Sequence, residues 1–107
     1  MSVIGKRLKE ARQEAGLSQE QLGIQAGIEE DSASARMNRY ERGTRSPGFE
    51  LLQRIGSVLD LPVTYFYSAD DGEAELLIAF HRMPSESKST LLAFAVNLTY
   101  HTGRIER

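Results

Sequence analysis

Four arginines recur at every third position between residues 36 and 45, and guanidinium groups bind phosphate oxygens and the edges of guanine bases. They are Arg36, Arg39, Arg42 and Arg45, with Glu41 as the only acidic residue among them. The surrounding segment, residues 18–47, has the pattern of two short helices that meet at Gly27. Such a helix pair can insert its second, polar helix into the major groove of DNA.

The distribution of charge supports this interpretation better than the net charge, which is −2. Residues 1–54 carry a net charge of +1 and residues 55–107 one of −3, whereas residues 32–54 alone carry +3. Attraction to nucleic acid depends on the local arrangement of charge. The sequence therefore predicts a small basic surface for double-stranded DNA on a protein that is acidic elsewhere.

The composition indicates a folded domain and excludes several kinds of chemistry. The 107 residues are 40% hydrophobic and contain no cysteine, which excludes disulfides, thiolate metal sites and cysteine nucleophiles. The N-terminus becomes charged without an apolar signal segment, and the longest apolar run is too short to span a membrane. We expect a cytoplasmic protein without membrane contact.

Hydrophobic periodicity predicts an all-α chain, since no alternating pattern is long enough to predict a strand. A first helix is expected over residues 2–15. Its buried stripe should contain Ile4, Leu8, Ala11 and Ala15. A second helix should begin at Ser18 and a third should run from a cap at Asp31 or Ser32 to Arg42. Further helices are expected after Ser46, after Pro62, over 73–82 and over 85–101.

Two local features of the second helix carry specific predictions. Ser18 followed by Gln21 is the pattern of a capping box, in which each residue bonds the backbone of the other. Gly23 costs about 1 kcal/mol inside a helix relative to alanine. Close packing against a neighbouring helix would explain its presence.

Residues 91–98, with the sequence LLAFAVNL, are apolar around nearly the whole circumference of the last predicted helix. A small monomer buries one stripe of a terminal helix rather than all sides. Two interpretations follow. The helix packs in a groove of its own domain, or it forms the contact between two copies of the chain, which we favour.

The motifs, taken in order, resemble the phage-repressor-like (XRE-type) helix-turn-helix regulators. They are G-x-R-L-K-x-x-R, L-S-Q-x-x-L, A-G-I, R-Y-E-R-G-x-R-x-P and L-x-x-I-x-x-x-L, within residues 4–67. The resemblance implies a five-helix repressor-like bundle over residues 1–68, followed by one or two C-terminal helices. It also implies a dimeric, sequence-specific regulator, most simply a repressor. We expect residues 72–107 to serve dimerisation, and an inverted repeat as the operator.

The resemblance also assigns roles to individual residues. Gln19 corresponds to a contact with the DNA backbone, and Arg12 with Glu41 to an ion pair between the first and third helices. The implied DNA-binding set on the third helix and the following loop is Ser34, Ala35, Arg36, Asn38, Arg39, Arg42 and Arg45. Arg39 suits a guanine edge, and Arg42 and Arg45 suit phosphates. Alternatively, Arg36 and Arg39 pair with Glu29, Asp31 or Glu41 on the surface.

The chain departs from the family pattern between Gly27 and Glu41. Fourteen positions separate these residues here, against about ten in most relatives. Either the turn is longer, or the third helix begins a turn earlier. The acidic residues 29–31 would repel phosphate, so we place them away from the DNA or at a helix cap.

Nothing in the sequence predicts an enzyme. No phosphate-binding glycine loop, nucleophile motif or pair of catalytic carboxylates is present. His81 and His101 have no ligand-type neighbours, so neither a metal nor another cofactor is expected. The alternatives to a simple DNA-binding regulator are an antitoxin-type regulator and a protein-interaction adaptor. In both, the C-terminal helices would bind a partner protein.

Overall fold

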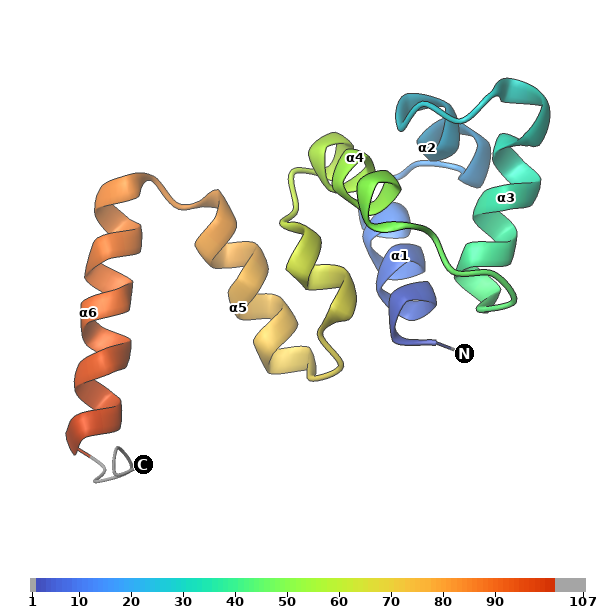
Figure 1. Ribbon diagram of the computed structural model, residues 1–107. Coiled ribbons are helices and arrows are strands. Elements are labelled where there is room, and N and C mark those ends of the chain that lie inside the picture. Colours follow the sequence, from blue (N-terminus) through green and yellow to red (C-terminus); the bar gives the residue numbers. More distant parts are fainter. Residues whose placement is uncertain (1, 102–107) are drawn as a thin grey trace.

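The computed structural model describes residues 2–101, and these form helices without any strand (Figure 1). The helices are α1 (Val3–Glu14), α2 (Gln19–Gln25), α3 (Glu30–Arg42), α4 (Phe49–Leu59), the 3₁₀-helix η1 (Val63–Tyr67), α5 (Asp71–Arg82) and α6 (Ser85–His101). The predicted all-α class is confirmed. None of the helices in the described part is both long and apolar enough to cross a membrane.

The hydrophobic core lies where α1, α2, α3, α4 and η1 meet, and it is aliphatic with a few aromatic rings. Its largest fully buried side chains are Phe66, Leu8, Leu22, Met37, Leu52 and Ile55. Of the stripe predicted for α1, Leu8 and Ala11 are buried, but Ala15 is exposed. That part of the prediction is wrong because α1 ends at Glu14, and Ala15 is its C-cap.

The predicted close packing of α2 is confirmed at Gly23. A Cβ atom built on this residue would lie 2.9 Å from the Cβ of Ala33 and 3.1 Å from the Cγ of Met37. The absence of a side chain therefore lets α2 lie directly on α3. The capping box of Ser18 and Gln21 is also present, with both bonds formed.

The extra residues between Gly27 and Glu41 lengthen α3 rather than the turn. The helix begins at Glu30, with Glu29 as N-cap, so the prediction of a cap at Asp31 or Ser32 is wrong. Glu30 and Asp31 occupy the first turn, where carboxylates stabilise the positive end of the helix dipole. Similarly, α4 begins after Gly48 rather than at Ser46.

The helix α5 is attached to the bundle and is not a free extension. Its Ala74 is buried in the common core, and Ile78 packs against that core. By contrast, α6 projects from the other helices (Figure 1), so that the chain as a whole is elongated, with extents of 54 × 28 × 22 Å. The side chains of α6 from Leu92 to Tyr100 are all exposed. The alternative in which this helix packs in a groove of its own domain is therefore wrong.

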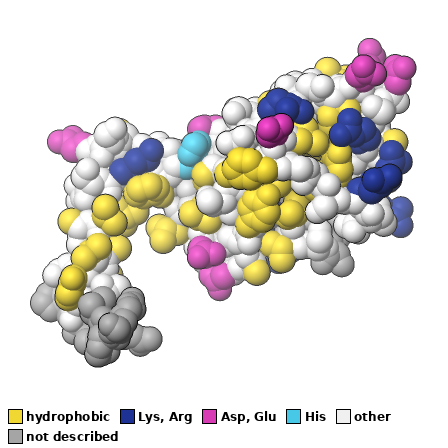
Figure 2. Space-filling view, viewed as in Figure 1, with side chains coloured by type: hydrophobic (Ala, Val, Ile, Leu, Met, Phe, Trp, Pro, Cys, Tyr) yellow, Lys and Arg dark blue, Asp and Glu magenta, His cyan; other side chains and the backbone are white. Residues whose placement is uncertain are grey.

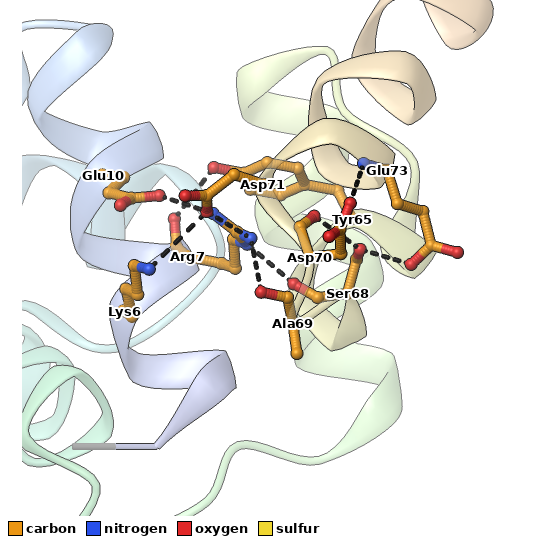
Figure 3. A network of polar contacts seen from close by, with 9 residues as sticks. All are labelled: Lys6, Arg7, Glu10, Tyr65, Ser68, Ala69, Asp70, Asp71 and Glu73. Carbon is orange, nitrogen blue, oxygen red and sulfur yellow. Dashed lines mark hydrogen bonds and ion pairs between the residues drawn. The ribbon is translucent and has the colours of Figure 1, made fainter.

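Arg7, a buried residue of α1, holds the start of α5 (Figure 3). Its Nε donates to the carbonyl of Ser68 at 2.8 Å, and one Nη donates to the carbonyl of Ala69 at 3.2 Å and to Asp71 Oδ1 at 2.9 Å. The other Nη donates to Glu10 at 3.0 Å. Burial alone would lower the pKa of Arg7, but the hydrogen bonds and charges of Asp71 and Glu10 together outweigh burial, so the pKa of Arg7 is raised above its ordinary value. The guanidinium therefore stays charged.

The ion pair of Arg7 and Asp71 should make the fold sensitive to acid. The hydrogen bond from Arg7, followed by the charge of Lys6, holds the pKa of Asp71 below its ordinary value. The carboxylate of Asp71 therefore binds a proton more readily in the unfolded chain than in the folded one. The pair stabilises the fold above the ordinary carboxyl pKa of about 4, and its contribution is lost as the pH falls through the lower folded-state pKa.

Urea unfolding of the natural protein and of Asp71→Asn tests this pH dependence. We expect the natural protein to be the more stable at pH 7, and the difference to shrink as the solution is acidified below about pH 4. The substitution leaves the other acid beside Arg7, Glu10, in place. A difference in stability that stays constant down to strong acid would contradict the prediction.

Candidate nucleic-acid interface

The turn between α2 and α3 fixes the angle of the helix pair. Gly27 has a φ of +96°, a left-handed conformation that side chains rarely adopt. The amide of Ile28 donates to the carbonyl of Gly23 at 2.9 Å, and Arg54 of α4 donates through Nε to the carbonyl of Ala26 at 2.8 Å. Arg54, counted above in the basic segment, thus holds the turn.

One side of α3 is buried and the other faces solvent. Ala33, Met37 and Tyr40 are buried. The outer side presents the exposed residues Ser34, Ala35, Arg39 and Arg42, and Arg45 is exposed in the loop that follows. Figure 2 shows basic side chains gathered over α3, with acidic ones at its first turn. The third helix therefore presents guanidinium groups outward.

Arg36 is oriented by an aromatic residue rather than by an acid. One Nη donates to the hydroxyl of Tyr40 at 2.8 Å, and its guanidinium carbon lies 5.8 Å from the centre of that ring. A pocket of about 220 Å³ lies here. It is lined by Arg36, Arg39, Tyr40, Arg45 and Ser46. Three guanidinium groups around one hollow suit an anion such as a phosphate.

These arginines carry positive charge that the fold does not neutralise. Within residues 2–101, none of Arg36, Arg39, Arg42 and Arg45 forms a salt bridge. The alternative pairing with Glu29, Asp31 or Glu41 is therefore absent. An exposed cluster of this kind is available to an external polyanion.

Arg12 and Glu41 join α1 to the end of α3. Arg12 Nε lies 2.6 Å from Glu41 Oε2, and one Nη lies 3.1 Å from Oε1, so the contact is bidentate. The Glu41 side chain is 3% exposed and that of Arg12 is 13% exposed. Arg12 also donates to the carbonyl of Leu17 at 2.9 Å, just before α2 begins. This pair connects α1, the start of α2 and α3.

Gln19 lies in this network and not free at the surface. Its Nε2 donates to Glu41 Oε1 at 3.0 Å and to Asn38 Oδ1 at 3.4 Å. Both hydrogens of the amide are therefore engaged within the protein. Contacts of Gln19 and Asn38 with DNA stay predictions, and a donation from the Gln19 amide to a phosphate requires its bonds to rearrange.

The histidines and carboxylates do not assemble a metal site in the described residues. His81 Nε2 lies 3.3 Å from Asp60 Oδ1 at the end of α4. The side chain of His101 lies outside what the structure describes.

A short helix pair on a small bundle, with an outward basic second helix, defines the class of helix-turn-helix DNA-binding domains. A family model described as helix-turn-helix domain matches residues 3–64. The chain belongs to this family, and the resemblance to XRE-type regulators is confirmed. Its family is one of DNA-binding regulators of transcription, and the roles of individual residues remain predictions.

Named relatives agree with this assignment. The chain is 34% identical over 70 residues to an uncharacterised HTH-type transcriptional regulator of Sinorhizobium medicae (strain WSM419), covering 65% of this chain and 48% of the relative. It is 32% identical over 68 residues to the HTH-type transcriptional regulator ImmR of Bacillus subtilis (strain 168), covering 64% and 50%. The match thus spans about half the length of these curated relatives.

Solved structures extend the likeness to the C-terminal helices. The chain resembles the transcriptional regulator BswR with a TM-score of 0.83 and 42% identity, covering 91% of this chain and 96% of that one. It also resembles a chain from a complex of the SinR and SinI proteins, with a TM-score of 0.65 and 26% identity. That match covers 94% of this chain and 98% of the other.

Proposed function

We propose that the protein is a cytoplasmic, dimeric transcriptional regulator, most simply a repressor, that binds an inverted repeat through α3. The observation that carries the proposal is the exposed arginine surface without acidic partners in the described residues. Arg42 and Arg45 bind phosphates, and Arg39 reads a guanine edge. Ser34 and Ala35 lie beside Arg39 on the outer side of the helix, where they can meet neighbouring bases.

The dimer follows from the exposed α6, which brings two copies together. Two recognition helices then meet half-sites about 34 Å apart along the duplex. The bundle of residues 1–68 serves as the DNA-binding part, and the segment 72–107 supplies the contact between copies.

Replacing Arg39 with alanine should weaken binding to a selected duplex by about 1–3 kcal/mol per half-site, the worth of one bidentate base contact. Replacing Arg42 or Arg45 should weaken binding to all sequences and reduce the salt slope by about one per contact. Fluorescence anisotropy at several salt concentrations measures both effects. Lys9→Ala on α1 also removes one positive charge, from an exposed side chain without a hydrogen bond or ion pair among the described residues, and it should change neither quantity.

Absence of binding to duplex DNA at low salt would refute the proposal. That result would favour a second candidate function, a protein-interaction adaptor that uses α6, whereas an antitoxin-type regulator would still bind DNA and would hold its partner protein through α6. The exposed apolar surface of α6 and the likeness to a chain from the SinR–SinI complex favour this use of α6. Light scattering tests the use of α6: the proposed regulator is a dimer without any other protein, whereas a module that uses α6 for a partner increases in mass when that partner is added.

A further inference from the structure

The helix α5 is held to the bundle by an arginine at each end. At its start, Arg7 of α1 binds two carbonyls of the connecting segment and Asp71 of α5 (Figure 3). Ser68 itself is buried, and its hydroxyl donates to Glu73 of α5. The connection between η1 and α5 is therefore fixed in position.

At its C-terminal end, α5 is hydrogen-bonded to the last turn of α4. Arg82 donates through Nε to the carbonyl of Asp60 at 3.0 Å and through one Nη to that of Leu59 at 3.1 Å. These carbonyls lie at the C-terminal end of α4, where the C-cap residue Asp60 has a φ of 57°. His81 lies beside the same Asp60 carboxylate.

The two attachments leave one joint between the bundle and α6. Between them, Ala74 and Ile78 pack on the core. Beyond them, Met83 and Pro84 join α5 to α6, and the ammonium group of Lys88 in α6 lies 5.5 Å from the ring centre of Phe80 in α5. The helix α5 is thus placed as an arm between the DNA-binding bundle and the projecting α6 (Figure 1).

We propose that Arg7 and Arg82 are positioning residues that lock α5 as a rigid arm and thereby set the half-site spacing that a dimer accepts. The inference rests on the proposed function, in which α6 joins two copies and α3 of each binds one half-site. Adding one base pair shifts the second half-site by about 3.4 Å and rotates it by about 35° around the duplex. A dimer rejects that change only if the path from α3 to α6 is stiff.

The test uses the full chain with Arg7→Met and the matched control Lys9→Met. Lys9 is exposed on the same helix and forms no hydrogen bond or ion pair with the described residues. Arg7→Met should fold with lower stability: the buried carbonyl of Ser68 loses its donor, whereas Asp71 and Glu10 are 79% and 47% exposed and can bind water. Circular dichroism verifies the fold. Asp71→Asn is a milder variant that removes the negative charge facing Arg7 but keeps an oxygen that can accept its hydrogen bond.

The first measurement is the distance between spin labels on Gln53→Cys in α4 and Ala79→Cys in α5. Both positions are exposed, and the chain has no cysteine of its own. Labelled protein is diluted with unlabelled protein so that only distances within one chain are seen. We expect a narrow distribution in the natural background and with Lys9→Met, and a broadened one with Arg7→Met. An unbroadened distribution with Arg7→Met would overturn the rigid lock.

The second measurement is selection from a random duplex pool, followed by binding to inverted repeats of the selected half-site at graded spacings. The natural protein and Lys9→Met should bind a spacing changed by one base pair about tenfold more weakly, since the duplex must be deformed. Arg7→Met should select the same half-site and lose most of this preference. An unchanged preference with Arg7→Met would overturn the inference. If the natural protein selects no sequence, the proposed function fails instead, while the label distances still test the lock.

Discussion

Replacing Arg12 with alanine should lower the free energy of unfolding by about 3–5 kcal/mol, because it leaves a buried carboxylate without its counter-charge. Glu41 is 2% exposed, and among the described residues only the amide of Gln19 would still donate to its carboxylate after the substitution. A natural domain is stable by about 5–15 kcal/mol in total. The loss should therefore be visible as a large decrease in the urea midpoint measured by circular dichroism.

Three further variants serve as controls for this prediction. Arg39→Ala removes the same charge from an exposed position of α3, so it should leave the urea midpoint nearly unchanged. Glu41→Ala should destabilise more than Arg39→Ala. The combined variant Arg12→Met with Glu41→Leu should recover part of the loss, since it removes both charges. Equal decreases in the urea midpoint for Arg12→Ala and Arg39→Ala would show that the ion pair of Arg12 and Glu41 does not stabilise the fold.

Features that depend on neighbouring residues could be predicted from the sequence. The capping box of Ser18 and Gln21 needs only a spacing of three residues, and the structure contains it. The outward side of α3 follows from helical periodicity once Met37 and Tyr40 are known to be buried. The projecting last helix could be foreseen because its sequence is apolar on all sides.

Features that depend on distant residues could not be predicted. Arg7 stands within the motif G-x-R-L-K-x-x-R, but its bonding partners Ser68, Ala69 and Asp71 follow more than sixty residues later. Two of them are backbone carbonyls, which carry no sequence signal. The start of α3 was misplaced for a different reason. A serine or aspartate is the usual N-cap, but here Glu29 takes that position without a side-chain bond.

The same limit applies to the binding surface. The sequence suggests Gln19 as a free donor to DNA, but α2 lies so close to α3 that Gln19 reaches Glu41 and Asn38. Arg36 is expected to bind DNA or to pair with an acid, and in the structure it donates to the hydroxyl of Tyr40 one helical turn away. Arg39 and Arg42 remain exposed as expected, so the candidate surface is best defined around them.

Replacing Leu92 and Phe94 together with aspartate should abolish dimerisation. These side chains are 59% and 60% exposed in the single chain. No other described part of the chain covers them, so the single chain exposes an apolar surface on α6 to water, which is unfavourable. A second copy can bury the same surface by symmetry. Two buried anchors of this size contribute about 2 kcal/mol or more each to a protein interface, so the dissociation constant should rise at least a hundredfold.

Light scattering over a range of protein concentrations measures this effect. Ser89→Asp adds one charge to an exposed polar position of α6 and serves as the control, which should remain dimeric. The melting temperature extrapolated to low protein concentration should be the same for all three proteins, because the substituted residues are exposed in the monomer. Binding to a selected inverted repeat should fall with the dimer, whereas binding to a single half-site should persist. A natural protein that stays monomeric at high concentration would refute the dimer and would leave the apolar surface of α6 to a different protein.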